Sequence, residues 1–264
     1  MRPPKIKEDR HFVTALARGL GVLQAFRSGE ERVSNAELAE RCGLPKSTIT
    51  RLTYTLTRIG FLHHDEESGR YRLGLATLTI GGTTLSRLQL RAAARPLLQD
   101  LANRTRTMVC LAIRDELSML YIETCRSESS IVTLRLDIGS RLPIATSAVG
   151  RACLAAETPV NRQALMERIR TADPAAWPQV ERGMRQAVTD LEQSGCVTSF
   201  GVWRREINAI AVPLALGKSL PLIVANSAAP VRTISQHAFL SDVRPQLIAT
   251  VRQIEERYAR QARV

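Results

Sequence analysis

Two short helical patterns joined by a tight turn, within residues 34–60, constrain the fold of this 264-residue chain more than any other feature. The first pattern begins at Ser34 and has Glu37 one helical turn later, which is the S-x-x-E form of a capping box. It is predicted to run to Arg41. Residues 42–44 then contain the glycine that a sharp reversal between two helices favours. The pattern therefore predicts a helix, a short turn and a second helix.

The second helix is predicted between Pro45, which can occupy the first helical position, and Gly60, which suits the stop. Its apolar side chains recur at helical spacing and form one stripe, namely Ile49, Leu52, Leu56 and Ile59. An ordinary amphipathic helix with a solvated polar face explains this pattern as well. The preceding helix and turn favour a helix-turn-helix, whose second helix enters the major groove of DNA. The candidate DNA-contacting residues on this helix are Lys46, Ser47, Thr48, Thr50, Arg51, Tyr54 and Arg58.

Residues 61–73 follow directly and predict a β-hairpin around an acidic turn that contains a glycine. In its second strand, Tyr71 and Leu73 alternate with Arg70 and Arg72. A hairpin behind a recognition helix is a wing. Its two arginines are therefore candidates for contact with the DNA backbone or the minor groove.

Several segments along the chain match one known family in their order and spacing. They are Arg18-Gly19-Leu20 with Leu23, residues 38–48, Arg51-Leu52 with Leu56, Gly60-Phe61-Leu62, and residues 71–74, 139–143, 148–152 and 210–214. On these segments the chain resembles the IclR family of bacterial transcriptional regulators. The resemblance implies an α+β protein in three parts: an N-terminal winged helix-turn-helix domain at residues 1–75, a linker helix at 76–91, and a C-terminal GAF-like α/β effector-binding and oligomerisation domain, with a mostly antiparallel sheet, at 92–264.

The resemblance also implies a set of partners. They are an operator in double-stranded DNA, a small-molecule effector expected to be a carboxylic or aromatic acid, a second copy of the chain in a homodimer or a dimer of dimers, and RNA polymerase as a further candidate. Such a protein acts in the cytoplasm and controls a catabolic operon. The alternative is a DNA-binding protein whose C-terminal domain only oligomerises or binds a protein partner. Dimerisation is expected at the linker helix, in which Gly81-Gly82 provides a bend or ends the helix.

Apolar spacing outlines the remaining elements. The first helix is expected to bury one face, made of Phe12, Leu16, Leu20, Leu23 and Phe26. Further helices are predicted from Arg95-Pro96 onward, at residues 148–156, 160–170 and 179–194, and at 235–260, where Pro245 kinks or splits the helix. Strands are predicted at residues 108–113, 117–123, 131–136, 209–216 and 220–225.

Three segments supply candidate residues for an effector pocket. Ser147 is a natural N-cap, which leaves the N–H groups of Ala148 and Val149 at a helix N-terminus. That terminus is either capped and nothing more, or it binds a carboxylate. The family resemblance favours carboxylate binding, because this loop borders the effector pocket in the relatives. The other candidates are Ser199, Trp203, Asn208, Ala209 and Asn226.

The sequence leaves two possible roles open for Trp203 and for two further candidates, Arg135 and Arg141. Trp203 serves as a pocket wall for an aromatic or longer aliphatic ligand, or as a core or interface residue. Arg135 and Arg141 can each bind a carboxylate with two parallel hydrogen bonds, although an ordinary surface role is the more common use of an arginine. The sequence carries no cofactor or metal motif to add to these candidates.

Composition narrows the classes of function. The net charge of +12 favours polyanion partners, but basic residues are spread along the chain, so the DNA prediction depends on the helix-turn-helix. The 5 cysteines are scattered without a C-x-x-C pair, which argues against a disulfide framework or a zinc site and favours small core residues. The sequence contains no G-x-S-x-G, H-E-x-x-H or Walker pattern, so an enzyme is not expected. No apolar run approaches the ~20 residues of a membrane span.

Overall fold

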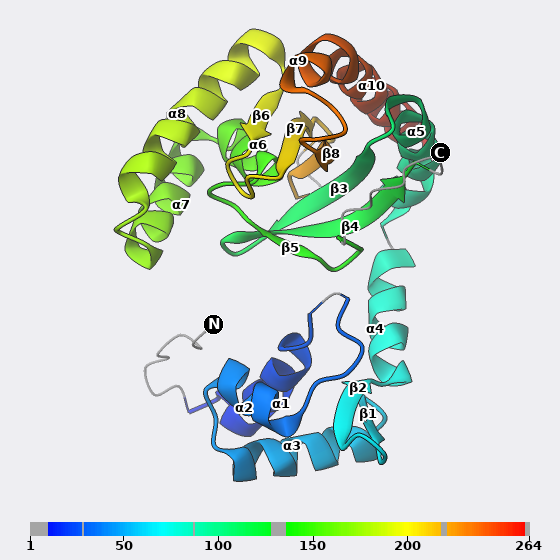
Figure 1. Ribbon diagram of the computed structural model, residues 1–264, viewed down its shortest axis with the longest axis vertical. Helices are drawn as coiled ribbons and strands as arrows, with labels where there is room; N and C mark the ends of the chain where they lie inside the picture. Colours follow the sequence, from blue (N-terminus) through cyan, green and yellow to red (C-terminus); the bar gives the residue numbers. More distant parts are fainter. Residues whose placement is uncertain (1–9, 28, 87, 128–135, 218–220, 262–264) are drawn as a thin grey trace. The chain divides into compact units, whose positions relative to one another are not determined.

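A computed structural model describes residues 10–27, 29–86, 88–127, 136–217 and 221–261. The chain divides into two compact units, Met1–Arg87 and Leu88–Val264, which are called unit 1 and unit 2 below. Unit 1 has one hydrophobic core and unit 2 has two. Figure 1 shows the helices and strands of both units. In the described residues no helix is long and apolar enough to cross a membrane.

Unit 1 is a bundle of short helices followed by a hairpin. Its elements are α1 (Thr14–Gln24), α2 (Asn35–Cys42), α3 (Lys46–Arg58), β1 (Leu62–Asp65), β2 (Arg70–Leu73) and α4 (Leu75–Ser86). Val22, Leu38, Ile49 and Leu56 are buried together and join α1, α2 and α3 into one core. The strands β1 and β2 pair antiparallel, as the wing prediction requires.

Capping residues determine where α2 begins, where it ends and where α3 starts. The Ser34 side chain accepts a hydrogen bond from the Glu37 backbone N–H at 3.3 Å, and the Glu37 carboxylate accepts one from the Ser34 backbone N–H at 2.8 Å. At the other end of α2, Gly43 adopts a left-handed conformation with φ 64°, which a residue without a Cβ tolerates best. Pro45 is the N-cap of α3 and Lys46 its first residue, so α3 begins one residue later than predicted.

The prediction for the buried face of the first helix was wrong for three residues. Phe12, Leu16 and Leu20 are 43%, 60% and 50% exposed. The packed face holds Gly19 and Val22, and the other two predicted residues, Leu23 and Phe26, are partly buried against the same core. Apolar spacing identifies a stripe on a helix but does not say whether the same domain covers it.

Two smaller expectations in unit 1 also changed. Ile59, the last member of the predicted stripe on α3, is 57% exposed because the helix ends at Arg58. The helix α4 continues through Gly81 and Gly82 to Ser86, so the glycine pair does not end it.

Unit 2 is a six-stranded antiparallel sheet covered by helices. Its elements are α5 (Gln89–Thr105), β3 (Met108–Asp115), β4 (Ser118–Arg126), β5 (Arg141–Pro143), α6 (Ala148–Ala156), α7 (Pro159–Ala172), α8 (Trp177–Ser194), β6 (Val197–Phe200), β7 (Ile207–Leu214), β8 (Ile223–Pro230), α9 (Gln236–Ala238), a π-helical turn (Phe239–Val243) and α10 (Arg244–Gln261). The strand order is β5-β4-β3-β8-β7-β6. This α+β architecture is the predicted one.

The sheet separates two hydrophobic cores. On one face, α6 with α7 and α8 covers a cluster that includes Tyr121, Val149 and Ala209. On the other face, α5 and α10 cover a cluster that includes Leu98 and Phe239 (Figure 1). Side chains that alternate along β7 and β8 therefore enter different cores.

The two predictions that depended on prolines in unit 2 had different outcomes. The helix α5 begins at Gln89 and contains Pro96 in its interior, although Pro96 was predicted to start it. Its buried side chains, such as Leu90 and Leu98, pack on the sheet, and this packing offsets the hydrogen bond that a proline cannot donate. Pro245 does split the closing helix, because a π-helical turn precedes it at Phe239–Val243.

The strand predictions were correct for the central hairpin and incomplete elsewhere. The strands β3 and β4 form the predicted hairpin, and β7 and β8 the second one, with β8 extending to Pro230. The edge strands β5 and β6 were missed because they are only 3 and 4 residues long. The strand predicted at 131–136 falls mainly outside the described residues, and Leu136 is not in a strand.

Candidate functional site

The free face of α3 carries the side chains that the sequence marked for DNA. Tyr54 is 66% exposed, and Thr48 is half-buried. The other five are also exposed, namely Lys46, Ser47, Thr50, Arg51 and Arg58. Across the helix, Ile49 is fully buried and the Thr53 hydroxyl donates to its carbonyl at 3.0 Å. The face of α3 that could enter a major groove is therefore polar, and its side chains do not belong to the hydrophobic core of unit 1.

The two wing arginines differ in their partners. Arg70 lies 3.5 Å from the Glu37 carboxylate and donates to the Arg32 carbonyl at 3.2 Å, so it ties the wing to α2. Arg72 is exposed, and no described residue forms an ion pair with it. Of the two, Arg72 is the better placed to reach a phosphate.

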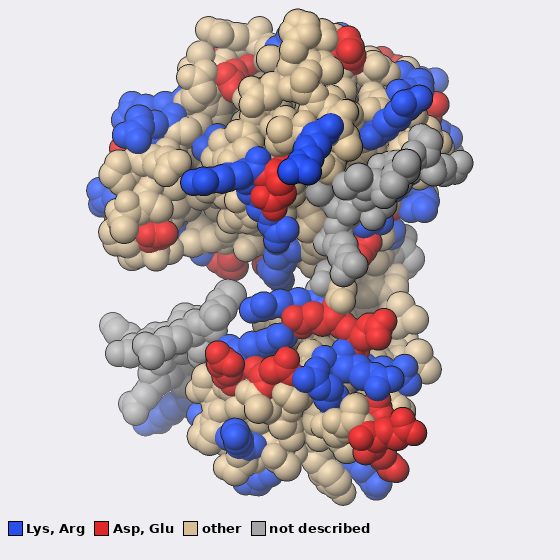
Figure 2. Space-filling model, viewed as in Figure 1, with Lys and Arg blue, Asp and Glu red and all other residues tan. Residues whose placement is uncertain are grey.

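Charge alone does not single out the DNA-binding surface. Figure 2 shows Lys and Arg side chains interspersed with Asp and Glu over both units. Arg51 and Arg58 are exposed on α3, and neither has an ion-pair partner among the described residues. The major groove of DNA admits an α-helix, and guanidinium groups on such a helix can bind phosphates or the edge of a guanine.

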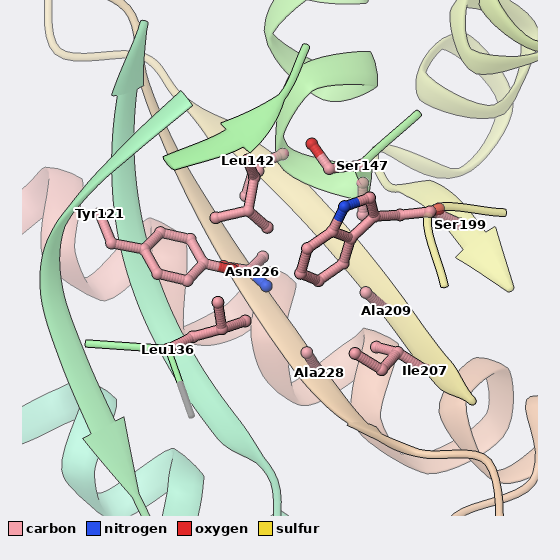
Figure 3. Close-up of a pocket in the computed structure, with 12 residues that line it drawn as sticks. Tyr121, Leu136, Leu142, Ser147, Ser199, Ile207, Ala209, Asn226 and Ala228 are labelled. Atoms are coloured by element: carbon pink, nitrogen blue, oxygen red, sulfur yellow. The ribbon is translucent and has the colours of Figure 1, made fainter. Parts of the chain in front are cut away.

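A pocket opens in unit 2 between the α6 side of the sheet and the N-terminus of α6 (Figure 3). The empty space between its lining residues is about 330 Å³ when the open solvent at the mouth is included, so the pocket is small. Apolar side chains dominate the wall, and four polar ones face it. The lining residues are Tyr121, Leu136, Leu142, Ser147, Ala148, Val149, Ser199, Trp203, Ile207, Ala209, Asn226 and Ala228.

One end of the pocket is the N-terminus of α6. The Ser147 hydroxyl accepts from the Gly150 N–H at 3.2 Å and donates to the Pro143 carbonyl at 2.6 Å, so the predicted cap is present. The N–H groups of Ala148 and Val149 have no acceptor among the described residues. Ser199 is occupied as well, since its hydroxyl donates to the Thr146 carbonyl at 2.8 Å. The free donors at this end are therefore backbone N–H groups with the positive end of the helix dipole behind them.

The other end of the pocket is made by Tyr121 on β4 and Asn226 on β8 (Figure 3). Both are buried, with 1% and 2% exposure. Burial raises the pKa of Tyr121 well above the ordinary value for a phenol. The buried phenol therefore stays neutral over a wider pH range than an exposed one.

Trp203 lies in the loop between β6 and β7, lines the pocket and packs against the core on that face. The Arg204 guanidinium stands over its ring, 4.6 Å from the centroid. Trp203 therefore has both of the roles that were considered: it forms part of the pocket wall and it packs against the core. A ligand that enters the pocket meets this indole.

Asn208 does not face the pocket, contrary to prediction. It is 1% exposed and lies between Ile207 and Ala209, which do line the pocket, so the alternation of β7 turns it toward α10. Its two amide atoms find no hydrogen-bond partner among the described residues. Arg141 is also outside the pocket, in an ion pair with Asp115. Arg135 lies outside the described residues.

Five lining residues escaped the sequence prediction: Tyr121, Leu136, Leu142, Ile207 and Ala228. Four are apolar and look like any core residue in the sequence. Tyr121 carried a usable signal, because a phenol between apolar neighbours in a predicted strand needs a hydrogen-bond partner once it is buried. No group of three or more His, Cys, Asp or Glu side chains in the described ranges is arranged to hold a metal ion.

A winged helix-turn-helix with a free recognition face, joined in one chain to a sheet domain with a small pocket, defines the class of DNA-binding transcriptional regulators. Two family models match: the IclR helix-turn-helix domain over residues 15–66, and the bacterial transcriptional regulator IclR C-terminal domain over residues 82–256. The chain therefore belongs to the IclR family of bacterial transcriptional regulators. Its relatives are named as regulators and not as enzymes, which agrees with the sequence prediction.

Individual relatives extend over nearly the whole chain. The HTH-type transcriptional regulator TsaQ1/TsaQ2 of Comamonas testosteroni is 30% identical over 96% of this chain and 91% of its own length. The crystal structure of an IclR family regulator from Brucella abortus is 42% identical, with a TM-score of 0.81 over 97% of this chain and 96% of that one. An IclR homologue from Microbacterium hydrocarbonoxydans, crystallised with 4-hydroxybenzoate, shares the fold at 21% identity and a TM-score of 0.73, over 93% of this chain and 99% of its own.

Proposed function

We propose that this regulator senses a small carboxylic or aromatic acid in the unit 2 pocket and thereby controls a catabolic operon from the cytoplasm. One observation carries the proposal: the unpartnered N–H groups of Ala148 and Val149 face an otherwise mainly apolar pocket. Such donors suit a carboxylate, and the apolar walls suit a hydrocarbon skeleton or ring. The Microbacterium homologue with bound 4-hydroxybenzoate supports the same class of ligand.

The DNA-binding part of the proposal rests on α3. Arg51 and Tyr54 project from the middle of its free face, Lys46 and Ser47 from its start. We propose that these residues, with Thr48, Thr50, Arg58 and Arg72, contact the operator. Side chains near the N-terminus of a recognition helix reach base edges, and cations further along reach phosphates.

Dimerisation is proposed for unit 1. Leu16 and Leu20 are exposed on α1 and Phe12 just before it, and Leu75 and Leu78 are 81% and 70% exposed on α4. Contiguous exposed apolar side chains on helices often mark a protein interface. A dimer would place two recognition helices on the half-sites of an imperfect palindrome. Effector binding would then change the spacing or pairing of the two DNA-binding units.

A metabolite screen tests the sensing function. The full chain is titrated with small carboxylic and aromatic acids, and melting temperature and operator affinity are measured with each. We expect saturable stabilisation by at least one class of acid together with a change in operator affinity. Binding of no acid, with DNA binding intact, would indicate instead that unit 2 only oligomerises or binds a protein partner.

A further inference from the structure

The wing hairpin carries four polar side chains on one face. Asp65 on β1 lies opposite Arg70 on β2, in the register nearest the turn. Two positions further from the turn, His63 lies opposite Arg72. Directly opposite residues share a face of a hairpin, and alternate residues return to that face, so both pairs point the same way. The pair nearest the turn is called the outer pair below, and His63 with Arg72 the inner pair.

The outer pair is engaged within unit 1. Asp65 forms an ion pair with Arg32. Arg70 lies 3.5 Å from the Glu37 carboxylate and donates to the Arg32 carbonyl at 3.2 Å. Contact with a phosphate would have to compete with the partners that these two side chains already have. The outer pair is therefore better suited to hold the hairpin against the rest of unit 1 than to bind DNA.

The turn beyond the outer pair is acidic. Glu66 and Glu67 are exposed, and neither forms an ion pair with a described residue. DNA carries a negative charge at each phosphate, so two uncompensated carboxylates disfavour a close approach of this turn to the duplex. The tip of the wing is consequently a poor candidate for insertion into the minor groove, which the sequence had left open for this hairpin.

The inner pair has neither of these constraints. His63 and Arg72 are both exposed, and no described residue forms an ion pair with either. The hairpin is fixed beside α3 at this end, because Leu62, which precedes His63, is 2% exposed and lies in one core with Leu56 of α3. A phosphate that borders the groove entered by α3 is therefore reached most easily from this end of the wing.

The chemistry of the inner pair suits a single phosphate. The Cβ atoms of directly opposite residues are roughly 5 Å apart, which lets both side chains reach one anion. The Arg72 guanidinium can donate two hydrogen bonds to phosphate oxygens, and the His63 imidazole has an N–H donor in its neutral and in its protonated form. Two donors that converge on one phosphate fix its position more firmly than either does alone.

We infer that His63 and Arg72 together hold one phosphate of the operator backbone, while the acidic turn stays outside the minor groove. The inference rests on the proposed operator contact of Arg72 and adds His63 to it. A phosphate contact carries no direct information about base sequence. The inner pair therefore positions the wing beside α3 and contributes equally on specific and non-specific DNA.

Binding measurements on the full chain test the inner pair. The probes are a duplex selected from random-sequence DNA and a shuffled duplex of the same length, each titrated at several salt concentrations. Arg72→Ala should weaken binding to both duplexes roughly tenfold and lower the slope of log affinity against log salt by about one. His63→Ala should weaken both roughly threefold to tenfold. His63→Gln, which keeps an N–H donor, should retain most of the affinity.

A double-mutant cycle tests whether the two side chains share one phosphate. If they do, Arg72→Ala already removes much of what His63 contributes, so the double variant should bind more tightly than the product of the two single losses implies. His237→Ala changes an exposed histidine on α9 in unit 2 and is the control that should have no effect. Thermal unfolding followed by circular dichroism should be unchanged in each variant, because these side chains are exposed.

The failures are distinguishable. An unchanged affinity in His63→Ala, losses that multiply in the double variant, or a loss confined to the selected duplex overturns the inference and leaves the operator contact of Arg72 intact. Weaker binding by the double variant Glu66→Gln with Glu67→Gln would place the turn on the DNA and also overturns it. An unchanged affinity in Arg72→Ala overturns the proposed contact and the inference together.

Discussion

Tyr121 and Glu123 lie two positions apart on β4 and face opposite sides of the sheet. Tyr121 lines the pocket, whereas the Glu123 carboxylate accepts hydrogen bonds from Arg91 at 3.1 Å and Arg95 at 2.7 Å, both on α5. A strand normally returns to the same face after two residues. Here the register against β3 shifts at Leu111/Ala112, so one extra residue on β4 forms a bulge that turns the two side chains apart.

Glu123→Gln should destabilise unit 2 by about 1–3 kcal/mol. Glu123 is 1% exposed, and removing its charge leaves Arg91 partly buried without its partner, although the exposure of Arg95 moderates the cost. Both tryptophans lie in unit 2, so urea unfolding followed by their fluorescence measures this unit. Glu116→Gln, which removes an exposed pair with Arg168, should change stability by less than about 0.5 kcal/mol. Equal effects of the two substitutions would refute a special role for the Glu123 pair.

Sequence patterns predicted correctly those features that depend on interactions within a few residues of the chain. The capping box at Ser34, the glycine turn at Gly43 and the proline-directed break before Pro245 each act within a few residues, and the structure contains all three. The face of the sheet on which Asn208 lies could not be predicted. The strand β7 is apolar on both faces, so alternation of apolar and polar residues does not show which side chains point to the pocket. The exposure of Leu16 and Leu20 could not be predicted either, since an apolar stripe that awaits a partner has the same spacing as one in a core.

Gly150→Ala should destabilise unit 2 and weaken acid binding together. A Cβ at Gly150 would overlap the carbonyl oxygen and Cα of Ile144, so α6 must move away from the preceding loop. We expect a loss of about 1–3 kcal/mol by tryptophan fluorescence in urea, because backbone atoms cannot yield as a flexible side chain can. Gly82→Ala is the control, as nothing lies within 4 Å of its Cβ position and the helix α4 belongs to unit 1. A Gly150→Ala protein with unchanged stability would contradict the close approach.

Four cysteines should resist alkylation in the folded chain. Burial raises the pKa of Cys110, Cys153 and Cys196 to about 12 and that of Cys125 to about 11, so at pH 8 almost no reactive thiolate is present. Cys42 is partly exposed and should react first with iodoacetamide. Peptide mapping by mass spectrometry, with a urea-unfolded sample as reference, measures the order. Early labelling of any of the four would show that its strand or helix opens in the native state.

Trp203→Ala should abolish the response to the effector and leave operator affinity unchanged. The indole lines the pocket and is braced by Arg204, whereas the recognition helix belongs to the other unit. Calorimetry with the acid found by the screen, and gel-shift titration with operator DNA, separate the two properties. Val202→Ala is the neighbouring control, since Val202 is not among the lining residues. Unchanged acid affinity in Trp203→Ala would remove the indole from the binding site.

Arg51→Ala should weaken operator binding by about 1–3 kcal/mol and relax the preference at one base pair. Arg51 is exposed on α3, free of ion pairs within the described residues, and about one helical turn from Tyr54. An arginine in this position can form two hydrogen bonds to a guanine, and losing them costs specificity as well as affinity. Selection from random DNA followed by competitive binding measures both quantities for the wild type and the variant. Arg185→Ala, an exposed arginine on α8, should have no effect. If Arg51→Ala lowers affinity equally for every sequence, Arg51 contacts a phosphate and the sequence is read by its neighbours on α3.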